Sequence, residues 1–198
     1  ETETSKLVIR LNEERNSLKR FEKEAWCIQK AAEKSIPGPS VIAVGENGGK
    51  AYMVQEFIPG VHGEDYPGDK INIWRRLGEY ARRIHSIPTD GFGETLLNPK
   101  TGNFSESWLE YLDYNINSLN KQDKLLELDV VDLEQSMRIK NLFQNLKTKE
   151  FRFAINHGDL SLKNTIITED GVVHLLDWGS AESHIVPHFD LAQILGCT

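Results

Sequence analysis

The sequence predicts an α+β fold, with short strands first, helices in the middle and a small hairpin near the end. Three observations predict this class. Short apolar runs bounded by turn residues surround one long amphipathic segment in residues 7–57. Stretches with helical periodicity follow, and short apolar runs return beyond Phe151. Strands and helices that are segregated along the chain in this way are typical of α+β proteins.

The first two elements are a short strand and a long helix. Residues 7–12 are mostly apolar and predict the strand. Apolar residues then recur at spacings of three and four, which predicts a helix from about Ser17 to Lys34. They are Leu18, Phe21, Ala25, Ile28 and Ala32. Pro37 and Pro39 end this helix, because proline cannot continue its hydrogen-bond ladder.

Two further strands are predicted at residues 41–44 and 51–57. Residues 45–50 separate them and are rich in glycine and asparagine, which tolerate the positive φ angles of tight turns. We therefore expect a hairpin. The glycine cluster lacks the Gly-Lys-Ser/Thr ending of a phosphate-binding loop, so that kind of loop is not predicted here.

The middle of the chain is predicted to be helical. Residues 58–70 are rich in proline, glycine and aspartate, and predict a linker. Helical periodicity then predicts helices at about 73–84, 108–119 and 133–146. The segment 85–105 contains several glycine and proline residues and predicts a loop.

The C-terminal part returns to short apolar runs. Residues 151–155 predict a strand. The runs 164–168 and 172–176 flank an Asp-Gly turn signal, so we expect them to form a small hairpin. A final helix is predicted to begin near His188.

Composition excludes several classes of partner. The 198 residues are 39% apolar and 27% charged, with a net charge of -7. No apolar run approaches the ~20 residues that cross a bilayer, so no membrane partner is expected. No basic run exceeds two residues, which argues against nucleic acid. Two cysteines, Cys27 and Cys197, are too few for a disulfide framework and predict a reduced, cytoplasmic setting.

The residues most indicative of function lie between His157 and Asp177. Asp159 is followed five positions later by Asn164, and thirteen positions after that by Asp177. The amide and the second carboxylate are oxygen ligands suited to Mg²⁺. The first carboxylate can orient an attacking hydroxyl and accept its proton. Because the expected hairpin brings Asn164 and Asp177 to the same end of two paired strands, the pattern predicts phosphoryl transfer.

Two segments resemble those of a known family. His-Gly-Asp-Leu-Ser-Leu-Lys-Asn at 157–164 and Leu-Asp-Trp-Gly at 176–179 resemble the catalytic loop and metal-binding segment of the aminoglycoside phosphotransferase and choline kinase-like family. The resemblance implies a two-lobed, protein kinase-like fold with a small antiparallel-sheet N-lobe and a mainly helical C-lobe. It implies a nucleotide-binding lobe over residues 1–57, ending in a hinge, and a catalytic lobe over residues 58–198.

The resemblance also implies roles for residues around the catalytic loop. Asp159 resembles the catalytic base, and Asn164 and Asp177 resemble the metal ligands. His157 resembles the residue that braces the loop, although a histidine packed in the core would also fit. Asp190 resembles the helical aspartate that holds the loop in place.

A nucleotide site is implied in the N-terminal part. Arg10 resembles the basic residue that touches the nucleotide phosphates, and Glu24 resembles its acidic partner on the following helix. Arg10 and Glu24 would also fit a simple surface ion pair. Gln55, Glu56 and Phe57 resemble the hinge whose backbone binds adenine.

The chain departs from the kinase pattern in three ways. Arg10 stands where many kinases have lysine, and its fork of donors differs in shape from an ammonium. Ser161 stands where protein kinases usually have lysine, which favours a small-molecule acceptor. The hairpin expected before Leu7 and the helices expected after Thr198 are missing, so a chain truncated at both ends is expected. We expect Lys163 to be a solvated side chain.

The leading hypothesis is an ATP-dependent kinase, with GTP as an alternative donor and Mg²⁺ as cofactor, that phosphorylates a hydroxyl of a small molecule. Aminoglycoside-like compounds, choline-like amines, sugars and amino-acid alcohols are the candidate acceptors. One alternative is a nucleotide-binding pseudokinase that acts as a scaffold, which Arg10 and the missing segments favour. Another is a metal-dependent phosphoester hydrolase, which would need more histidine and aspartate ligands than the sequence displays.

Overall fold

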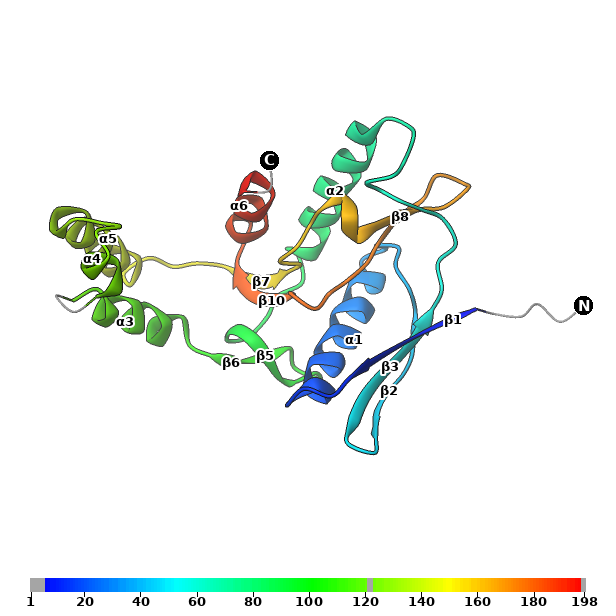
Figure 1. The fold of residues 1–198 in the computed structure, drawn as a ribbon, viewed down its shortest axis with the longest axis horizontal. Helices are drawn as coiled ribbons and strands as arrows, with labels where there is room; N and C mark the ends of the chain where they lie inside the picture. Colours follow the sequence, from blue (N-terminus) through cyan, green and yellow to red (C-terminus); the bar gives the residue numbers. More distant parts are fainter. Residues whose placement is uncertain (1–5, 121–122, 197–198) are drawn as a thin grey trace, which may run out of the picture. The chain divides into compact units, whose positions relative to one another are not determined.

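The computed structural model of the chain describes residues 6–120 and 123–196 (Figure 1). Helices and three small antiparallel sheets make up this described part, which confirms the predicted α+β class.

Cys27 is a free thiol buried in the first helix, and burial raises its pKa to about 12. Cys197 lies outside the described residues.

The chain divides into two compact units. One unit is formed by Glu1–Ser105 together with Phe153–Thr198, and the other by Glu106–Arg152. This division follows contacts within each unit, and it differs from the lobe boundary expected after residue 57. The boundary between the expected nucleotide-binding and catalytic lobes stays a prediction.

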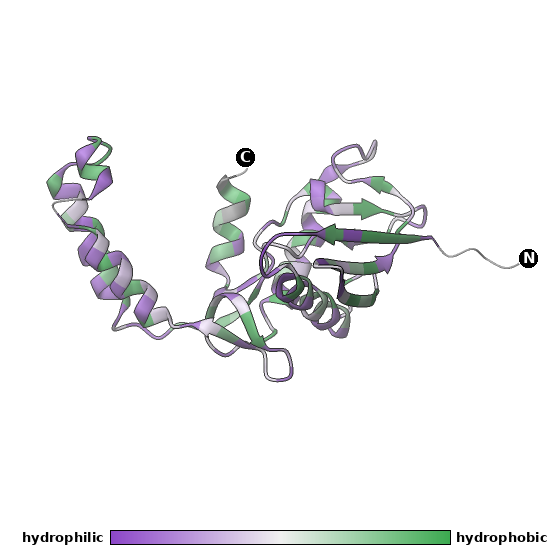
Figure 2. Ribbon diagram, turned by 60° about the horizontal axis from the view of Figure 1, so that its bottom comes forward, coloured by the Kyte–Doolittle hydropathy of each residue, from purple (hydrophilic) through white to green (hydrophobic). Residues whose placement is uncertain are grey.

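The N-terminal sheet of the first unit consists of β1 (Leu7–Asn12), β2 (Val41–Asn47) and β3 (Lys50–Glu56). The strands are antiparallel in the order β1-β3-β2. All three predicted strands are confirmed, and β2 continues three residues beyond its predicted end. Figure 2 shows β1 as a largely hydrophobic strand that is interrupted by hydrophilic residues.

Helix α1 (Ser17–Glu33) confirms the predicted helix to within one residue. Phe21 packs with Met53 of β3 in a small core between the helix and the sheet. Trp26 and Cys27, further along α1, belong to the main core of the unit. Helix α1 packs against the N-terminal sheet with one part and against the main core with another. It therefore connects the sheet with the segments that carry the expected catalytic residues.

Helix α2 (Lys70–Ile84) begins where a side chain caps its first turn. The carboxylate of Asp69 accepts a hydrogen bond from the backbone N–H of Ile71 at 2.8 Å, which satisfies a donor that the helix itself cannot pair. The helix predicted at 73–84 is confirmed. Its buried face consists of Ile73, Leu77, Tyr80, Ala81 and Ile84, all part of the main core.

The prediction of a loop over residues 85–105 was wrong. This segment contains β5 (Phe92–Asn98) and β6 (Asn103–Glu106). They join β10 (Glu182–Ile185) and β7 (Phe153–Asn156) in a four-stranded sheet of order β6-β5-β10-β7. Because β5 pairs with a strand that lies far away in the sequence, the local pattern of glycines and prolines did not indicate it.

The linker predicted at 58–70 also contains a short strand, β4 (Val61–His62). It pairs with β8 (Thr165–Ile167), which forms a hairpin with β9 (Val173–Leu175). The hairpin around the Asp-Gly turn is therefore confirmed. The pairing of β4 was not predicted, because two residues are too few to show a strand pattern.

The second unit consists of α3 (Trp108–Ser118), α4 (Lys124–Glu127) and α5 (Leu133–Leu146). Helices α3 and α5 confirm the predictions and pack together, whereas α4 was not predicted. A capping box between Asp132 and Gln135 starts α5. Figure 2 shows hydrophilic residues along much of this unit.

Candidate active site

The residues after β7 form a loop from His157 to Ser161 and then the short 3₁₀ helix η1 (Leu162–Asn164). Gly158 has a φ of 77°, and a Cβ atom there would lie 2.3 Å from the carbonyl oxygen of Ser180. Only glycine fits both conditions. The next side chain, that of Asp159, is 28% exposed and so can meet a substrate.

Asp190, on α6 (His188–Gly196), anchors this loop through hydrogen bonds. It is fully buried, and its Oδ1 accepts a hydrogen bond from Gly158 N–H at 2.8 Å. Its Oδ2 accepts from His157 N–H at 3.1 Å and from the Nε2–H of His85 at 2.8 Å. Burial by itself raises the pKa of Asp190. These hydrogen bonds lower the pKa by a larger amount, so it lies below its usual value and the carboxyl stays ionised.

His157 links the loop to the end of β9. Its ring Nε2 donates to the carbonyl oxygen of Leu176 at 3.0 Å, and its Nδ1 accepts from Asp159 N–H at 3.3 Å. These opposite roles fit a neutral imidazole. Burial lowers the pKa of His157, which favours the same form. The geometry supports the expected bracing role and assigns no proton transfer to this ring.

Asn164 and Asp177 lie at the open end of the β8–β9 hairpin. Thr165 pairs with Leu175 in the last register position, and the N–H of Leu176 donates to the carbonyl oxygen of Asn164 at 2.9 Å. The strands therefore bring the two residues to the same end, as the sequence predicts. Asp177 is exposed and has a φ of 55°, a left-handed conformation that non-glycine residues rarely adopt.

The donor atoms of these two residues fit a hard cation such as Mg²⁺. The amide Nδ2 of Asn164 donates to the backbone oxygen of Asp159 at 2.8 Å. The nitrogen therefore faces the catalytic loop, and the amide oxygen remains as the donor for a cation. Carboxylate oxygens of Asp177 would complete an all-oxygen set of the kind that Mg²⁺ prefers. The metal role itself stays a prediction.

Lys163 is exposed, as expected, but it also forms an ion pair that was not predicted. Its side chain is 55% exposed, but its ammonium lies 2.9 Å from Oδ2 of Asp159. Partial burial raises the pKa of Asp159, whereas hydrogen bonds from Lys163 and Asn164 lower it below its usual value. The expected base is therefore ionised and has a cation beside it.

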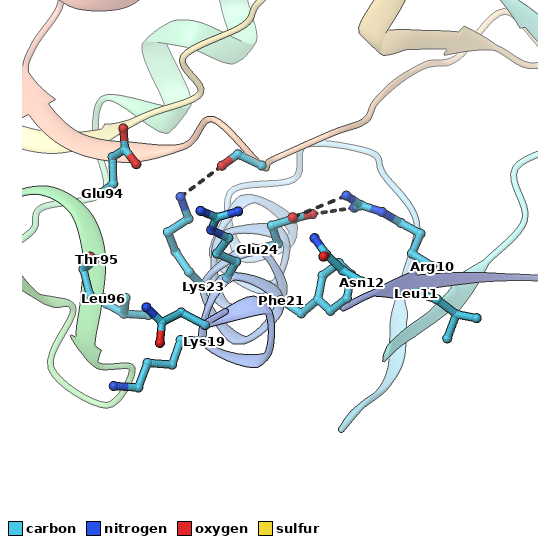
Figure 3. A pocket seen from close by; sticks show the side chains of 13 residues that line it. Arg10, Leu11, Asn12, Lys19, Phe21, Lys23, Glu24, Glu94, Thr95 and Leu96 are labelled. Atoms are coloured by element: carbon cyan, nitrogen blue, oxygen red, sulfur yellow. Dashed lines mark hydrogen bonds and ion pairs between the residues drawn. The ribbon is translucent and has the colours of Figure 1, made fainter. Parts of the chain in front are cut away.

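Arg10 and Glu24 form an ion pair between β1 and α1. The two groups are joined by contacts of 2.5 Å and 3.4 Å from the guanidinium to the two carboxylate oxygens (Figure 3). Glu24 is almost fully buried, so the pair is not a simple surface contact. Burial raises the pKa of Glu24, and the charge of Arg10 offsets part of that rise.

The residues expected to form the hinge lie at the end of β3. The N–H of Glu56 donates to Ser40 at 2.9 Å, and the N–H of Phe57 donates to Lys6 at 3.2 Å. Both backbone donors are therefore occupied within the fold. The adenine contact expected from Gln55 to Phe57 stays a prediction.

A cavity of about 500 Å³ lies beside the Arg10–Glu24 pair (Figure 3). The end of β1 and the first half of α1 line one side, and Glu94 to Leu96 of β5 line the other. Gly179 also lines it, so the cavity borders the expected metal-binding segment. The expected base and metal ligands do not line the cavity, which therefore adjoins the site without containing it.

Comparison with models of protein families shows which family the chain belongs to. A model of the phosphotransferase enzyme family matches residues 1–197, which is nearly the whole chain. The chain belongs to that family. The resemblance seen at residues 157–164 and 176–179 is thereby confirmed. A search of curated proteins finds no match to this chain.

Solved structures show the same fold. A thermostable variant of aminoglycoside phosphotransferase APH(4)-Ia, bound to AMP-PNP and hygromycin B, has a TM-score of 0.70 at 20% identity, covering 98% of this chain and 65% of that one. The GDP complex of aminoglycoside 2'-phosphotransferase-IIIa has a TM-score of 0.60 at 16% identity, covering 96% and 65%. Aminoglycoside-3'-phosphotransferase of type VIII has a TM-score of 0.58 at 20% identity, covering 96% and 68%.

These likenesses confirm the protein kinase-like fold. At such low identities they show the fold alone. The chain spans about two thirds of the length of those solved chains. Among the described residues, no helix is both long and apolar enough to span a bilayer.

Sequence reasoning missed three contributors to this site. Lys23 is buried and donates a hydrogen bond to the segment that follows Asp177. His85 donates a hydrogen bond to Asp190. Lys163 forms an ion pair with Asp159. Only the last had a local signal, since its charge lies four positions after the aspartate. The other two contacts join residues more than 100 positions apart, which no local pattern records.

Proposed function

We propose that this protein is a kinase that transfers the γ-phosphoryl group of ATP to a hydroxyl group of a small molecule. One observation carries the proposal. The β8–β9 hairpin brings Asn164 and Asp177 to its open end, and the amide of Asn164 bonds the backbone of Asp159. Two oxygen ligands and a base thus share one framework, and membership of the phosphotransferase family supports the same reaction class.

Asp159 would bind the acceptor hydroxyl and take its proton as the new oxygen–phosphorus bond forms. Its lowered pKa keeps the carboxylate in the form that accepts a proton. The bracing contacts of His157 and Asp190 hold the loop in one conformation, and such positioning supplies much of the rate in phosphoryl transfer. Lys163 would place positive charge beside the transferred group.

The phosphates would be held from two sides. Asn164 and Asp177 would hold Mg²⁺, which when bound neutralises charge on the phosphate oxygens. Arg10, fixed by Glu24, would direct its guanidinium donors to the phosphates. The carbonyl oxygens of residues 55–57 would border the adenine.

The nucleotide and the acceptor are proposed at the level of chemical class. One similar structure contains AMP-PNP and another GDP, so ATP is the proposed donor and GTP the alternative. Hygromycin B occupies the first of these, which supports a polar, hydroxyl-bearing acceptor such as an aminoglycoside. Choline-like amines, sugars and amino-acid alcohols remain candidates. The cytoplasmic location and the lack of nucleic-acid or membrane partners stay predictions from composition.

The two alternative functions have less support. A scaffold without catalysis is at odds with a base that is ionised and braced by two separate residues. A phosphoester hydrolase would use a ligand-rich metal site. Over the part of the chain that the structure describes, no group of three or more His, Cys, Asp or Glu side chains could hold a metal ion.

The proposal is tested by turnover. The protein is incubated with ATP, Mg²⁺ and a panel of hydroxyl-bearing acceptors, and ADP formation is followed. We expect at least one acceptor to stimulate turnover, and Asp159→Ala to lower kcat by roughly 10²–10⁴, the usual share of a general base. Nucleotide affinity should stay within a few-fold.

Asp170→Ala is the matched control, because that carboxylate is exposed on the turn of the same hairpin. It should leave kcat unchanged. Undiminished activity in Asp159→Ala would refute the mechanism. Nucleotide binding without stimulation by any acceptor would favour the scaffold.

A further inference from the structure

Lys23 is a buried lysine that the proposed mechanism does not use. It lies on α1, directly before Glu24, and is only 5% exposed. Lysine is almost never this buried without partners, because removing an ammonium from water costs free energy that hydrogen bonds must offset. Its surroundings therefore show what the charge does.

The two acceptors of Lys23 are backbone oxygens of one short segment. Its Nζ donates to the carbonyl of Ala181 at 2.6 Å and to that of Gly179 at 3.0 Å. Figure 3 shows the lysine extended from α1 toward this backbone. Both acceptors follow Asp177 by two and four residues, so the ammonium fixes the path of the chain that leaves the expected metal ligand.

The same segment contacts α1 at a second point. A Cβ atom on Gly179 would lie 3.2 Å from Oδ1 of Asp177 and 3.5 Å from Oε1 of Glu24. The turn after Asp177 is thus close to the carboxylate that pairs with Arg10. Lys23 and Glu24 together place one helical turn of α1 against this segment.

The conformation of Asp177 needs such support. Its φ of 55° is costly for a residue with a Cβ atom, and strained backbone persists only where the surroundings hold it. Within the turn itself, the N–H of Gly179 donates to Oδ1 of Asp177 in a long bond of 3.3 Å. The two bonds from Lys23 add an anchor from outside the turn.

We propose that Lys23 is a positioning residue that holds the turn carrying Asp177 against α1. The carboxylate of Asp177 and the guanidinium of Arg10 then face the nucleotide and its metal in one fixed arrangement. This inference rests on the proposed function, because it assigns Lys23 to the same metal site. The two hydrogen bonds of its ammonium go to backbone oxygens of Gly179 and Ala181, so Lys23 would act through the backbone of the turn.

The test measures metal binding separately from catalysis. Mn²⁺ replaces Mg²⁺, and its dissociation constant in the presence of AMP-PNP is measured by electron paramagnetic resonance. In Lys23→Met, which keeps the length of the apolar stem, we expect Mn²⁺ to bind about 10-fold more weakly, since residues that orient a metal ligand typically contribute 10–100-fold. The kcat should fall by a similar factor, and the KM for ATP should change less.

Lys30→Met is the matched control, because Lys30 lies on the same helix and pairs at the surface with Glu33. It should leave Mn²⁺ affinity unchanged. If Lys23→Met does not fold, Lys23→Gln, which keeps one donor for the carbonyls, is expected to show a smaller loss of the same kind.

Three outcomes distinguish a failure of this inference from a failure of the proposed function. Unchanged Mn²⁺ affinity in a folded Lys23 variant, with a lower melting temperature alone, would show a purely structural lysine and overturn the inference. An equal loss in Lys30→Met would overturn it as well. A wild-type protein that binds no Mn²⁺ with AMP-PNP would instead overturn the proposed metal site and hence the proposed function.

Discussion

At the scale of single residues, the loop around Asp159 depends on neighbours that carry no chemistry of their own. Gly158 allows the backbone to pass close to Ser180, and His157 joins the loop to the end of β9. Each contact restricts where the carboxylate can lie. A reaction that depends on positioning is sensitive to such contacts.

We predict that Gly158→Ala destabilises the protein far more than Gly171→Ala. Both glycines have left-handed backbones, with φ of 77° and 80°, so alanine at either position costs about 1–2 kcal/mol. A Cβ at position 158 would also lie 2.3 Å from the Ser180 oxygen, whereas nothing lies within 4 Å at position 171. We expect the extra clash to cost at least about 2 kcal/mol in urea unfolding. Equal losses would show that the loop can move.

At the scale of elements, α6 and the catalytic loop are joined through one buried carboxylate. Asp190 accepts hydrogen bonds from two backbone N–H groups of the loop and from His85 at the end of α2. Three separate elements thus meet at a single charge. Buried charges of this kind are stable only when every partner is present.

We predict that Asp190→Asn lowers the free energy of unfolding by about 2–4 kcal/mol. The variant removes the charge and turns an acceptor into a donor that faces buried N–H groups, which leaves them unsatisfied. Asp113→Asn is the control, because that carboxylate is about half exposed and pairs with Lys147 at the surface. It should change stability by less than about 1 kcal/mol. Thermal unfolding of both variants measures the difference, and similar values would contradict the anchoring role.

At the scale of the first compact unit, stability depends on a histidine packed between elements. The ring of His184 on β10 stacks on Phe189 of α6 at 4.2 Å and contacts Phe92 of β5. Its Nδ1 accepts a hydrogen bond from the N–H of Ile185 at 2.8 Å. Burial lowers the pKa of His184 to about 4, although the charge of Asp190 partly opposes this. The packing therefore favours the neutral ring.

This pKa predicts loss of stability in mild acid. The unfolded chain has a histidine pKa near 6.5 and binds more protons than the folded one between about pH 4 and 6.5. The stabilisation is complete above pH 6.5 and is lost as the pH falls toward 4. It amounts to at most about 3 kcal/mol, reduced to about 1–2 kcal/mol by solvent around a partly exposed ring.

Urea unfolding at several pH values tests this prediction. His184→Gln should be less stable than the wild type at pH 7, and the difference should shrink toward pH 4. A constant difference across that range would refute it, because carboxylate titration affects both proteins alike.

Local sequence patterns were sufficient for much of this fold. The apolar spacing in Ser17–Glu33 and Leu133–Leu146 predicted both helices closely, because apolar residues recur at helical period in each. The Asp-Gly turn predicted the β8–β9 hairpin for a similarly local reason. Strands β5 and β10 were missed, since their stability comes from a partner far along the chain.

The sequence by itself predicted phosphoryl transfer, because Asp159, Asn164 and Asp177 lie in one short segment whose spacing and hairpin are local properties. Only the tertiary structure showed that Lys23 and His85 support that segment. Lys23 donates to its backbone and His85 donates to Asp190, each across more than 100 positions of sequence. A buried charge can be recognised only when its partners are known, because its hydrogen bonds depend on how the chain packs and not on which residues precede it.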